Sequence, residues 1–86
     1  MFNWLKGKRD KRPEYEEAKL IAQSDDEEAR RELAALTDLE PELLYFFATD
    51  KNSKVRQAVA ENKNAPIHAK LILSKDKDEA VRKKLA

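Results

Sequence analysis

The chain has 86 residues, of which 41% are hydrophobic and 41% charged, with one Gly, three Pro and no Cys. The lack of cysteine excludes disulfides and thiolate metal sites, and no apolar run approaches the roughly 20 residues of a membrane-spanning helix. One small domain is expected from this length, and a Gly-poor mixture rich in Ala, Leu, Glu and Lys favours helix over sheet.

The formal net charge is only +1, but the charges are segregated along the chain. Residues 1–13 carry a net +4, residues 14–32 a net −5, residues 33–50 a net −4 and residues 51–86 a net +6. A domain with such a dipole can steer charged partners, or bring its own copies together head to tail. The alternative is a solvated surface with an accidental bias.

Residues 1–12 are predicted to form a basic aromatic arm. Its short apolar part comes first and no cleavage site follows, so it is not a signal peptide and a cytoplasmic location is expected. Bulky apolar groups beside a basic cluster suit an anionic membrane surface or nucleic-acid phosphates. In the alternative, Trp4 and Leu5 fold back and seal the end of the first helices. The arm residues that would make the contact are Phe2, Trp4, Lys6, Lys8, Arg9, Lys11 and Arg12.

The first helix is predicted over residues 13–23, because Pro13 suits a first helical turn and the glutamates after it favour a helix N-terminus. Ser24 is a natural N-cap, and Glu27 would complete a capping box with it, so the next helix is expected over residues 26–36.

The segment 41–49 is the most hydrophobic of the chain, and its composition alone would allow a strand. A helix is predicted instead, because the equivalent segment 66–74 contains Ala and Lys, which are poor strand residues. The remaining helices are predicted over about 53–61, with Asn52 or Ser53 as the cap, and over about 78–86.

A motif recurs every 26 residues, since residues 24–30 return as 50–56 and again as 76–82. A fixed period of this length indicates stacked helical units. We therefore predict a helical repeat domain over residues 13–86, with units at 24–49 and 50–75 and a partial unit at 76–86. Because the third unit lacks its second helix, the chain is expected to be part of a longer protein. The alternative is that its last helix serves as a cap.

Two prolines open the second helices of the units, and Pro41 and Pro66 are 25 residues apart. This spacing predicts that the turn inside the first unit is one residue longer than its counterpart. It also makes Tyr45 equivalent to Lys70, and it places His68, the only histidine, at a partly buried helix position.

The pattern D-x-x-x-x-V-R-x-x-[VL]-A-x-N-x-x-[AT]-P resembles the short HEAT-like repeat of bacteria, close to the leucine-rich repeat variant. The second unit matches it at Asp50, Val55, Arg56, Val59, Ala60, Asn62 and Pro66. The third unit matches its opening half at Asp76, Val81, Arg82, Leu85 and Ala86, and the first matches more loosely at Ser24, Ala29, Arg30, Leu33, Ala34 and Pro41.

The start of the chain is also similar to the N-terminal region of an uncharacterised family of bacterial HEAT-like proteins. Over residues 13–86 the resemblance implies an all-α, HEAT-like α-solenoid, a right-handed stack of short antiparallel helix pairs used for protein contacts. Variant-repeat proteins can hold an iron–sulfur cluster through cysteines, but this chain has no cysteine, so that feature is not carried over.

The arginine of the motif, present as Arg30, Arg56 and Arg82, repeats in phase with the core. In a stack, each arginine could reach Asp50 or Asp76 of a neighbouring unit, and planar guanidinium groups suit such half-buried ion pairs. We predict a structural ladder of ion pairs from this repetition. The alternative is a row that binds anions or phosphates.

The sequence contains no recognisable catalytic constellation, with one His, one Gly and no Cys, so an enzyme, a metal site, a cofactor and a small-molecule substrate are not expected. The second helices of such stacks usually line the face where partners dock, and tyrosine is favoured there. Glu42, Tyr45 and Lys70 are therefore the predicted partner-binding residues. The alternative is that Tyr45 packs against the first helix or the arm. The predicted core of these helices is Leu44, Phe47, Ala69 and Ile72.

The sequence thus predicts a non-catalytic scaffold or adaptor for a protein partner, whose identity the sequence does not give. The alternative is peripheral membrane or nucleic-acid binding through the aromatic arm and the basic C-terminal half.

Overall fold

The computed structural model describes residues 12–85, and this part of the chain is all-helical, without strands. The arm residues Phe2, Trp4, Lys6, Lys8, Arg9 and Lys11, as well as Ala86, lie outside the described residues. Six helices follow one another: α2 (Tyr15–Ala22), α3 (Glu27–Ala34), α4 (Pro41–Phe47), α5 (Ser53–Glu61), α6 (Ile67–Ser74) and α7 (Glu79–Lys84).

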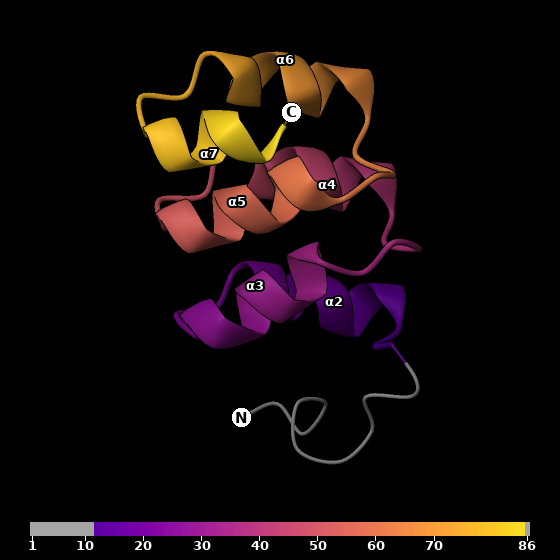
Figure 1. Cartoon of the computed structure of the whole chain (residues 1–86). Helices are drawn as coiled ribbons and strands as arrows, with labels where there is room; N and C mark the ends of the chain where they lie inside the picture. Colours follow the sequence, from indigo (N-terminus) through magenta and orange to yellow (C-terminus); the bar gives the residue numbers. More distant parts are fainter. Residues whose placement is uncertain (1–11, 86) are drawn as a thin grey trace.

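The helices are arranged as three pairs, α2–α3, α4–α5 and α6–α7, which lie one above another (Figure 1). Helices α2, α4 and α6 contact one another in sequence and form one layer. Helices α3, α5 and α7 likewise form the second layer. Each layer therefore receives one helix from every pair.

Backbone hydrogen bonds show that all three pairs are copies of one 26-residue unit. The N–H groups of Ala18, Leu44 and Lys70 donate to the carbonyl groups of Glu14, Glu40 and Pro66 at the start of α2, α4 and α6. The N–H groups that close these helices, from Ser24, Asp50 and Asp76, repeat with the same spacing. Helix α2, which we predicted to precede the repeat, is thus its first member, and the units run over 14–39, 40–65 and 66–85.

The predicted extra residue in the turn of the first unit is wrong. Pro41 is the first residue of α4, whereas Pro66 is the N-cap of α6, so the two prolines are not equivalent. Both positions accept proline because neither N–H group is needed inside the helix. Tyr45 therefore corresponds to Leu71, and not to Lys70.

The helices of the second layer begin at caps that share one position of the unit. Asp26, Asn52 and Asp78 each accept backbone N–H groups from the first turn of α3, α5 and α7. The prediction of Ser24 as the cap of α3 is wrong, because its hydroxyl group accepts the N–H of Asp26 at 3.2 Å instead. The Asn52 cap is confirmed, as is a helix rather than a strand at 41–47.

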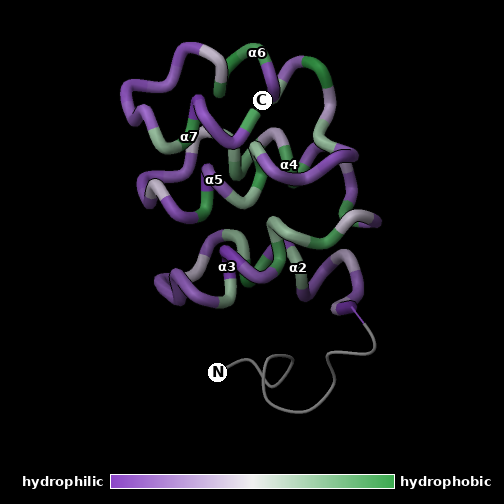
Figure 2. Tube along the Cα trace, in the orientation of Figure 1, coloured by the Kyte–Doolittle hydropathy of each residue, from purple (hydrophilic) through white to green (hydrophobic). Residues whose placement is uncertain are grey.

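The core runs through the stack between the two layers, and apolar segments recur in every pair (Figure 2). Ile21, Phe47 and Leu73 share one position of the unit and are fully buried in all three pairs. Ala29, Val55 and Val81 do the same in the other layer. Of the predicted core residues, Leu44, Phe47 and Ala69 are buried, whereas Ile72 is only half-buried because it occupies the position of exposed Phe46.

Candidate binding surface

The large hydrophobic side chains that remain exposed within residues 12–85 all belong to the layer of α2, α4 and α6. They are Leu20, Tyr45, Phe46, Ile67 and Leu71, with exposed fractions of 61%, 49% or 47%, 63% and 56% in the order α2, α4, α6. Apolar side chains are scattered over most protein surfaces, but their confinement to one layer is informative. We refer to the outer side of this layer as the α2–α4–α6 face.

The repeat arranges these side chains in rows that cross the three helices. Leu20, Phe46 and Ile72 occupy one position of the unit and form a row that is apolar throughout. Tyr45 and Leu71 belong to the adjacent row. The sequence analysis missed the apolar row because the spacing of the two prolines shifted α6 by one residue against α4; the 26-residue spacing, extended back through α2, would have found it.

A hollow lies between the starts of α4 and α6 and is lined by Pro41, Glu42, Tyr45, Pro66 and His68. It brings together two of the three predicted partner-binding residues, Glu42 and Tyr45, and leaves out Lys70. His68, expected at a partly buried position, is exposed at its rim because it shares the outward position of Glu42.

Tyr15 supports the hollow from the neighbouring pair. Its hydroxyl group donates a hydrogen bond to Glu42 Oε2 at 3.3 Å, and Lys19 Nζ lies 5.0 Å from the centre of its ring. Desolvation of the phenol and the nearby negative charge of Glu42 raise the pKa of Tyr15. These contacts connect the first pair to the second and hold Glu42 beside the hollow.

Ion pairs between successive units join the turns at the opposite edge of the stack. Arg30 donates from Nε to Asp50 Oδ2 at 2.9 Å and from Nη2 to Asp50 Oδ1 at 3.2 Å. Its Nη1 donates to the carbonyl oxygen of Ser24 at 2.6 Å, in the turn of its own pair. Only 3% of the Arg30 side chain and 6% of the Asp50 side chain are exposed. Such a pair is satisfied by several hydrogen bonds at once, which a buried charge requires.

The second rung repeats this geometry one unit further on. Arg56 binds both carboxylate oxygens of Asp76, at 2.8 and 3.3 Å, and donates to the carbonyl oxygen of Asp50 at 2.7 Å. Arg82 donates to the carbonyl oxygen of Asp76 in the same way, but no carboxylate within residues 12–85 accepts from its Nε or Nη2. The structure thus brings four of the five predicted ladder residues into two ion pairs and leaves the third rung half formed.

Asn62 adds a second connection between units on the other side of the stack. Its side-chain amide donates to the carbonyl oxygens of Ala34 and Leu36, both at 2.9 Å, and its side chain is buried. The carbonyl groups at the C-terminus of α3 therefore find a partner in the next unit, as buried acceptors must.

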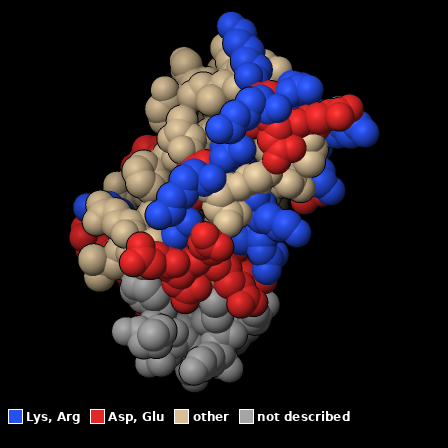
Figure 3. Space-filling view, turned by 90° about the vertical axis from the view of Figure 1, so that its left-hand side faces the viewer, with Lys and Arg blue, Asp and Glu red and all other residues tan. Residues whose placement is uncertain are grey.

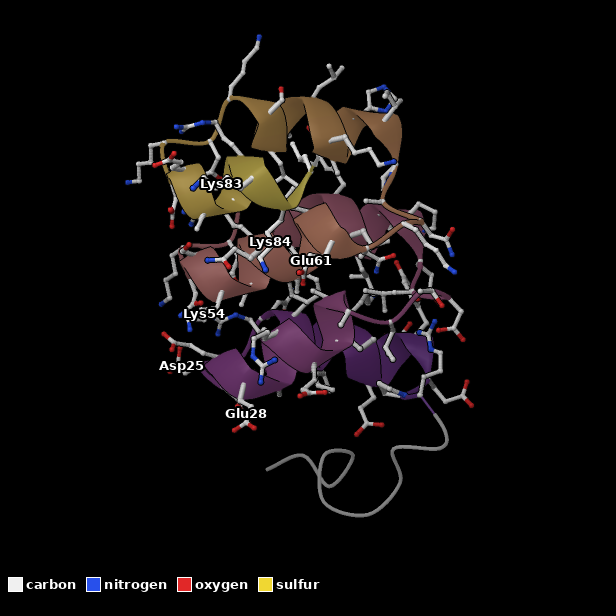
Figure 4. The ribbon with its side chains drawn as sticks, in the orientation of Figure 1. Asp25, Glu28, Lys54, Glu61, Lys83 and Lys84 are labelled. Carbon is white, nitrogen blue, oxygen red and sulfur yellow. The ribbon has the colours of Figure 1, made fainter. Side chains whose placement is uncertain are left out.

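The charged side chains divide the turn side of the molecule into two parts. Acidic side chains gather on it near the α2–α3 pair, and basic side chains run across the pairs above (Figure 3). In Figure 4, Asp25 and Glu28 lie at the level of α3, Lys54 above them on α5, and Lys83 and Lys84 on α7. The basic side is partly neutralised, because Lys84 Nζ lies 2.9 Å from Glu61 Oε2.

Arg12, the last residue of the predicted arm, is part of the folded domain. Its guanidinium group donates to Glu40 Oε1 and to the carbonyl oxygen of Asp38, both at 2.8 Å. The hydrogen bond from Arg12 lowers the pKa of Glu40. Arg12 therefore joins the start of the first unit to the start of the second.

In the part of the chain that the structure describes, no group of three or more His, Asp or Glu side chains is placed to hold a metal ion, and no helix is long and apolar enough to cross a membrane. Comparison of the chain with protein-family models, curated proteins and solved structures found no match.

Proposed function

We propose that this chain is a HEAT-like α-solenoid, built from short antiparallel helix pairs, that binds a protein partner through its α2–α4–α6 face and performs no catalysis. The 26-residue spacing of caps, core positions and ladder contacts supports the solenoid. The observation that carries the binding function is the confinement of the exposed large hydrophobics, among residues 12–85, to one layer.

The rows of the α2–α4–α6 face suit a partner that lies along the stack. Packed helices are about 8–10 Å apart, so Leu20, Phe46 and Ile72 repeat at about that interval. A helix of the partner repeats its side chains at about 10.5 Å for every seventh residue. A partner helix with apolar side chains at this spacing would contact all three units. Tyr45 and Phe46 lie in the middle unit and supply the aromatic side chains that interface centres favour.

Site-specific photo-crosslinking tests this proposal. A benzoylphenylalanine at position 45 should crosslink one discrete protein in lysate of the source cells. The same group at position 54, on the exposed surface of α5, should not. The variant Phe46→Ser should abolish the crosslink from position 45 without unfolding the chain, because the side chain is already 49% exposed. Equal crosslinking from positions 45 and 54, or insensitivity to Phe46→Ser, would contradict the assignment of the face.

A second candidate is contact with an anionic membrane or nucleic acid, favoured by the basic side chains that cross the turn side in Figure 3. Residues 66–86 carry six basic and three acidic residues. Binding of this kind weakens steeply as the salt concentration rises, whereas apolar contacts at Tyr45 and Phe46 do not. Titration of the full chain with anionic vesicles and with duplex DNA, at low and high salt, separates this candidate from the first.

A further inference from the structure

One position of the unit faces the pair that follows in the stack, as the burial pattern shows. Ala18 and Leu44 occupy it in the first two pairs, and they are 0% and 1% exposed. Lys70 occupies it in the third pair, where no described pair covers it, and it is half-buried. The α6–α7 end of the stack therefore presents a cation where the inner pairs present an apolar side chain.

A neighbouring position faces the pair that precedes. Leu43 and Ala69 occupy it in the second and third pairs and are buried. Glu17 occupies it in the first pair and is half-buried. The α2–α3 end thus presents an anion at the position that corresponds to an apolar contact inside the stack. Within residues 12–85, neither Glu17 nor Lys70 has an ion-pair partner.

The charges of whole units follow the same direction. Residues 14–39 carry nine acidic and three basic residues, for a net charge of −6. Residues 40–65 carry four of each, and residues 66–86 carry three acidic and six basic residues, for a net +3. Opposite ends of the stack are therefore electrostatically complementary.

The half-formed rung at Arg82 adds a directed contact at the basic end. Its guanidinium group is held by the carbonyl oxygen of Asp76, as Arg56 is held by that of Asp50. In the inner rungs, Nε and Nη2 reach the turn of the next unit along the stack. The corresponding turn of an added unit would lie beyond α6–α7, on the side away from α4–α5.

We propose that the α6–α7 end binds the α2–α3 end of a second copy, head to tail, in the register of the repeat. Lys70 of one copy then lies against Glu17 of the next, in place of the apolar contacts between inner pairs. Arg82 meets the turn at residues 24–26, which carries two carboxylates. The contact is heterologous, so it extends into open chains unless its rotation closes a ring.

This contact is weak in the wild-type chain for two reasons. An end made of two helices of six to eight residues offers far less than the roughly 800 Å² per partner of a stable interface. In addition, Ser24 stands where Asp50 and Asp76 complete the inner rungs, so Arg82 finds no carboxylate at that position. Association should therefore depend on concentration and salt. The proposal concerns the ends of the stack and does not rest on the function proposed for the α2–α4–α6 face.

Sedimentation equilibrium of the full chain provides the first test, with the variants Glu17→Lys and Lys70→Glu. Wild type should exceed the monomer mass as its concentration rises at low salt, and each variant alone should remain monomeric because like charges then meet. An equimolar mixture of the two variants should associate again, since every junction regains opposite charges. A monomeric wild type at millimolar concentration and low salt, or a mixture that stays monomeric, would overturn the proposal.

Ser24→Asp tests the register and does not depend on the weak wild-type affinity. It supplies the missing carboxylate and should tighten self-association about tenfold or more. Ser24→Asn, of the same size but neutral, should give no such gain, and adding Arg82→Gln to Ser24→Asp should remove it. Circular dichroism verifies that each variant is folded. Equal association of Ser24→Asp and Ser24→Asn would show that Arg82 does not meet this turn, and would contradict the proposed register.

Discussion

The α2–α3 and α6–α7 pairs share one backbone plan but differ at the positions that face along the stack. Both bury the same inner positions, Ile21 and Leu73 among them, completely. At the facing positions, the first pair has Glu17 and the last has Lys70, where the middle pair has Leu43 and Leu44. The comparison indicates that positions buried in every pair determine the fold, whereas the facing positions determine what each end can contact.

Exchanging facing residues between an inner pair and the end should give the largest effect. Leu44→Lys places a charge at a position that is 1% exposed, and we expect a loss of more than about 4 kcal/mol in the free energy of unfolding. The reverse exchange, Lys70→Leu, should change stability by about 1 kcal/mol or less, because the position is only half-buried. Urea denaturation followed by circular dichroism measures both values. Similar losses would mean that the two positions are not equivalent members of a repeat.

The inner and outer rungs of the ladder should respond just as differently. Asp50→Asn leaves Arg30 buried without a counter-charge, and we expect it to cost about 3–5 kcal/mol. Arg82→Gln removes an exposed guanidinium group and should cost about 0.5 kcal/mol or less. Chemical denaturation of dilute protein, where copies do not associate, gives both numbers. A tolerated Asp50→Asn would show that the ladder contributes little to stability.

The connection on the other side of the stack should have a smaller effect. Asn62→Ala leaves two carbonyl groups of the preceding unit without their donor, and we expect a loss of about 2–3 kcal/mol. Asn64 donates to the carbonyl oxygen of Thr37 at 2.6 Å but is exposed, so Asn64→Ala is the matched control and should cost less than about 1 kcal/mol. Thermal unfolding of the two variants side by side measures the difference. If Asn64→Ala were the more damaging, burial would not be the deciding factor.

The smallest expected effect is a loss of stability in acid. The pKa of Glu40 lies below its ordinary 4.5 because of Arg12, and that of Asp78 below its ordinary 3.8, mainly because Ser53 donates to it. A lowered folded-state pKa means that the stabilisation is present above these ordinary values and is lost as the pH falls through the lowered ones. NMR titration of the carboxyl carbons should show both midpoints, and Arg12→Gln should raise that of Glu40 alone. An unchanged Glu40 midpoint in that variant would contradict the assigned cause.

The all-helical class and the 26-residue period could be predicted because the core and ladder residues repeat in the sequence itself. The register of α6 could not, because proline is compatible with both the N-cap and the first helical position, and Pro66 was taken as the counterpart of Pro41. Ser24 was taken as a cap for a similar reason, since its hydroxyl group serves the turn before the helix equally well. These local ambiguities were resolved only by hydrogen bonds between residues that the sequence does not pair.

The candidate face was predictable in part. Tyr45 and Glu42 were identified from their place on the second helices, and they line one hollow. Phe46 and Leu71 were missed, since an apolar run does not reveal which side chains face outward until the register is fixed. Lys70 belongs to the end of the stack because its position is the one that a following pair would cover.

The measurement that tests the repeat architecture most directly is hydrogen exchange at the three ladder arginines, followed by NMR on dilute wild-type protein. The Nε–H groups of Arg30 and Arg56 are bound to carboxylates and buried, so they should exchange slowly. The Nε–H of Arg82 should exchange rapidly, and it should become protected at high concentration in the Ser24→Asp variant. Equal, rapid exchange at all three arginines would contradict the ladder, and with it the account of three stacked copies of one unit.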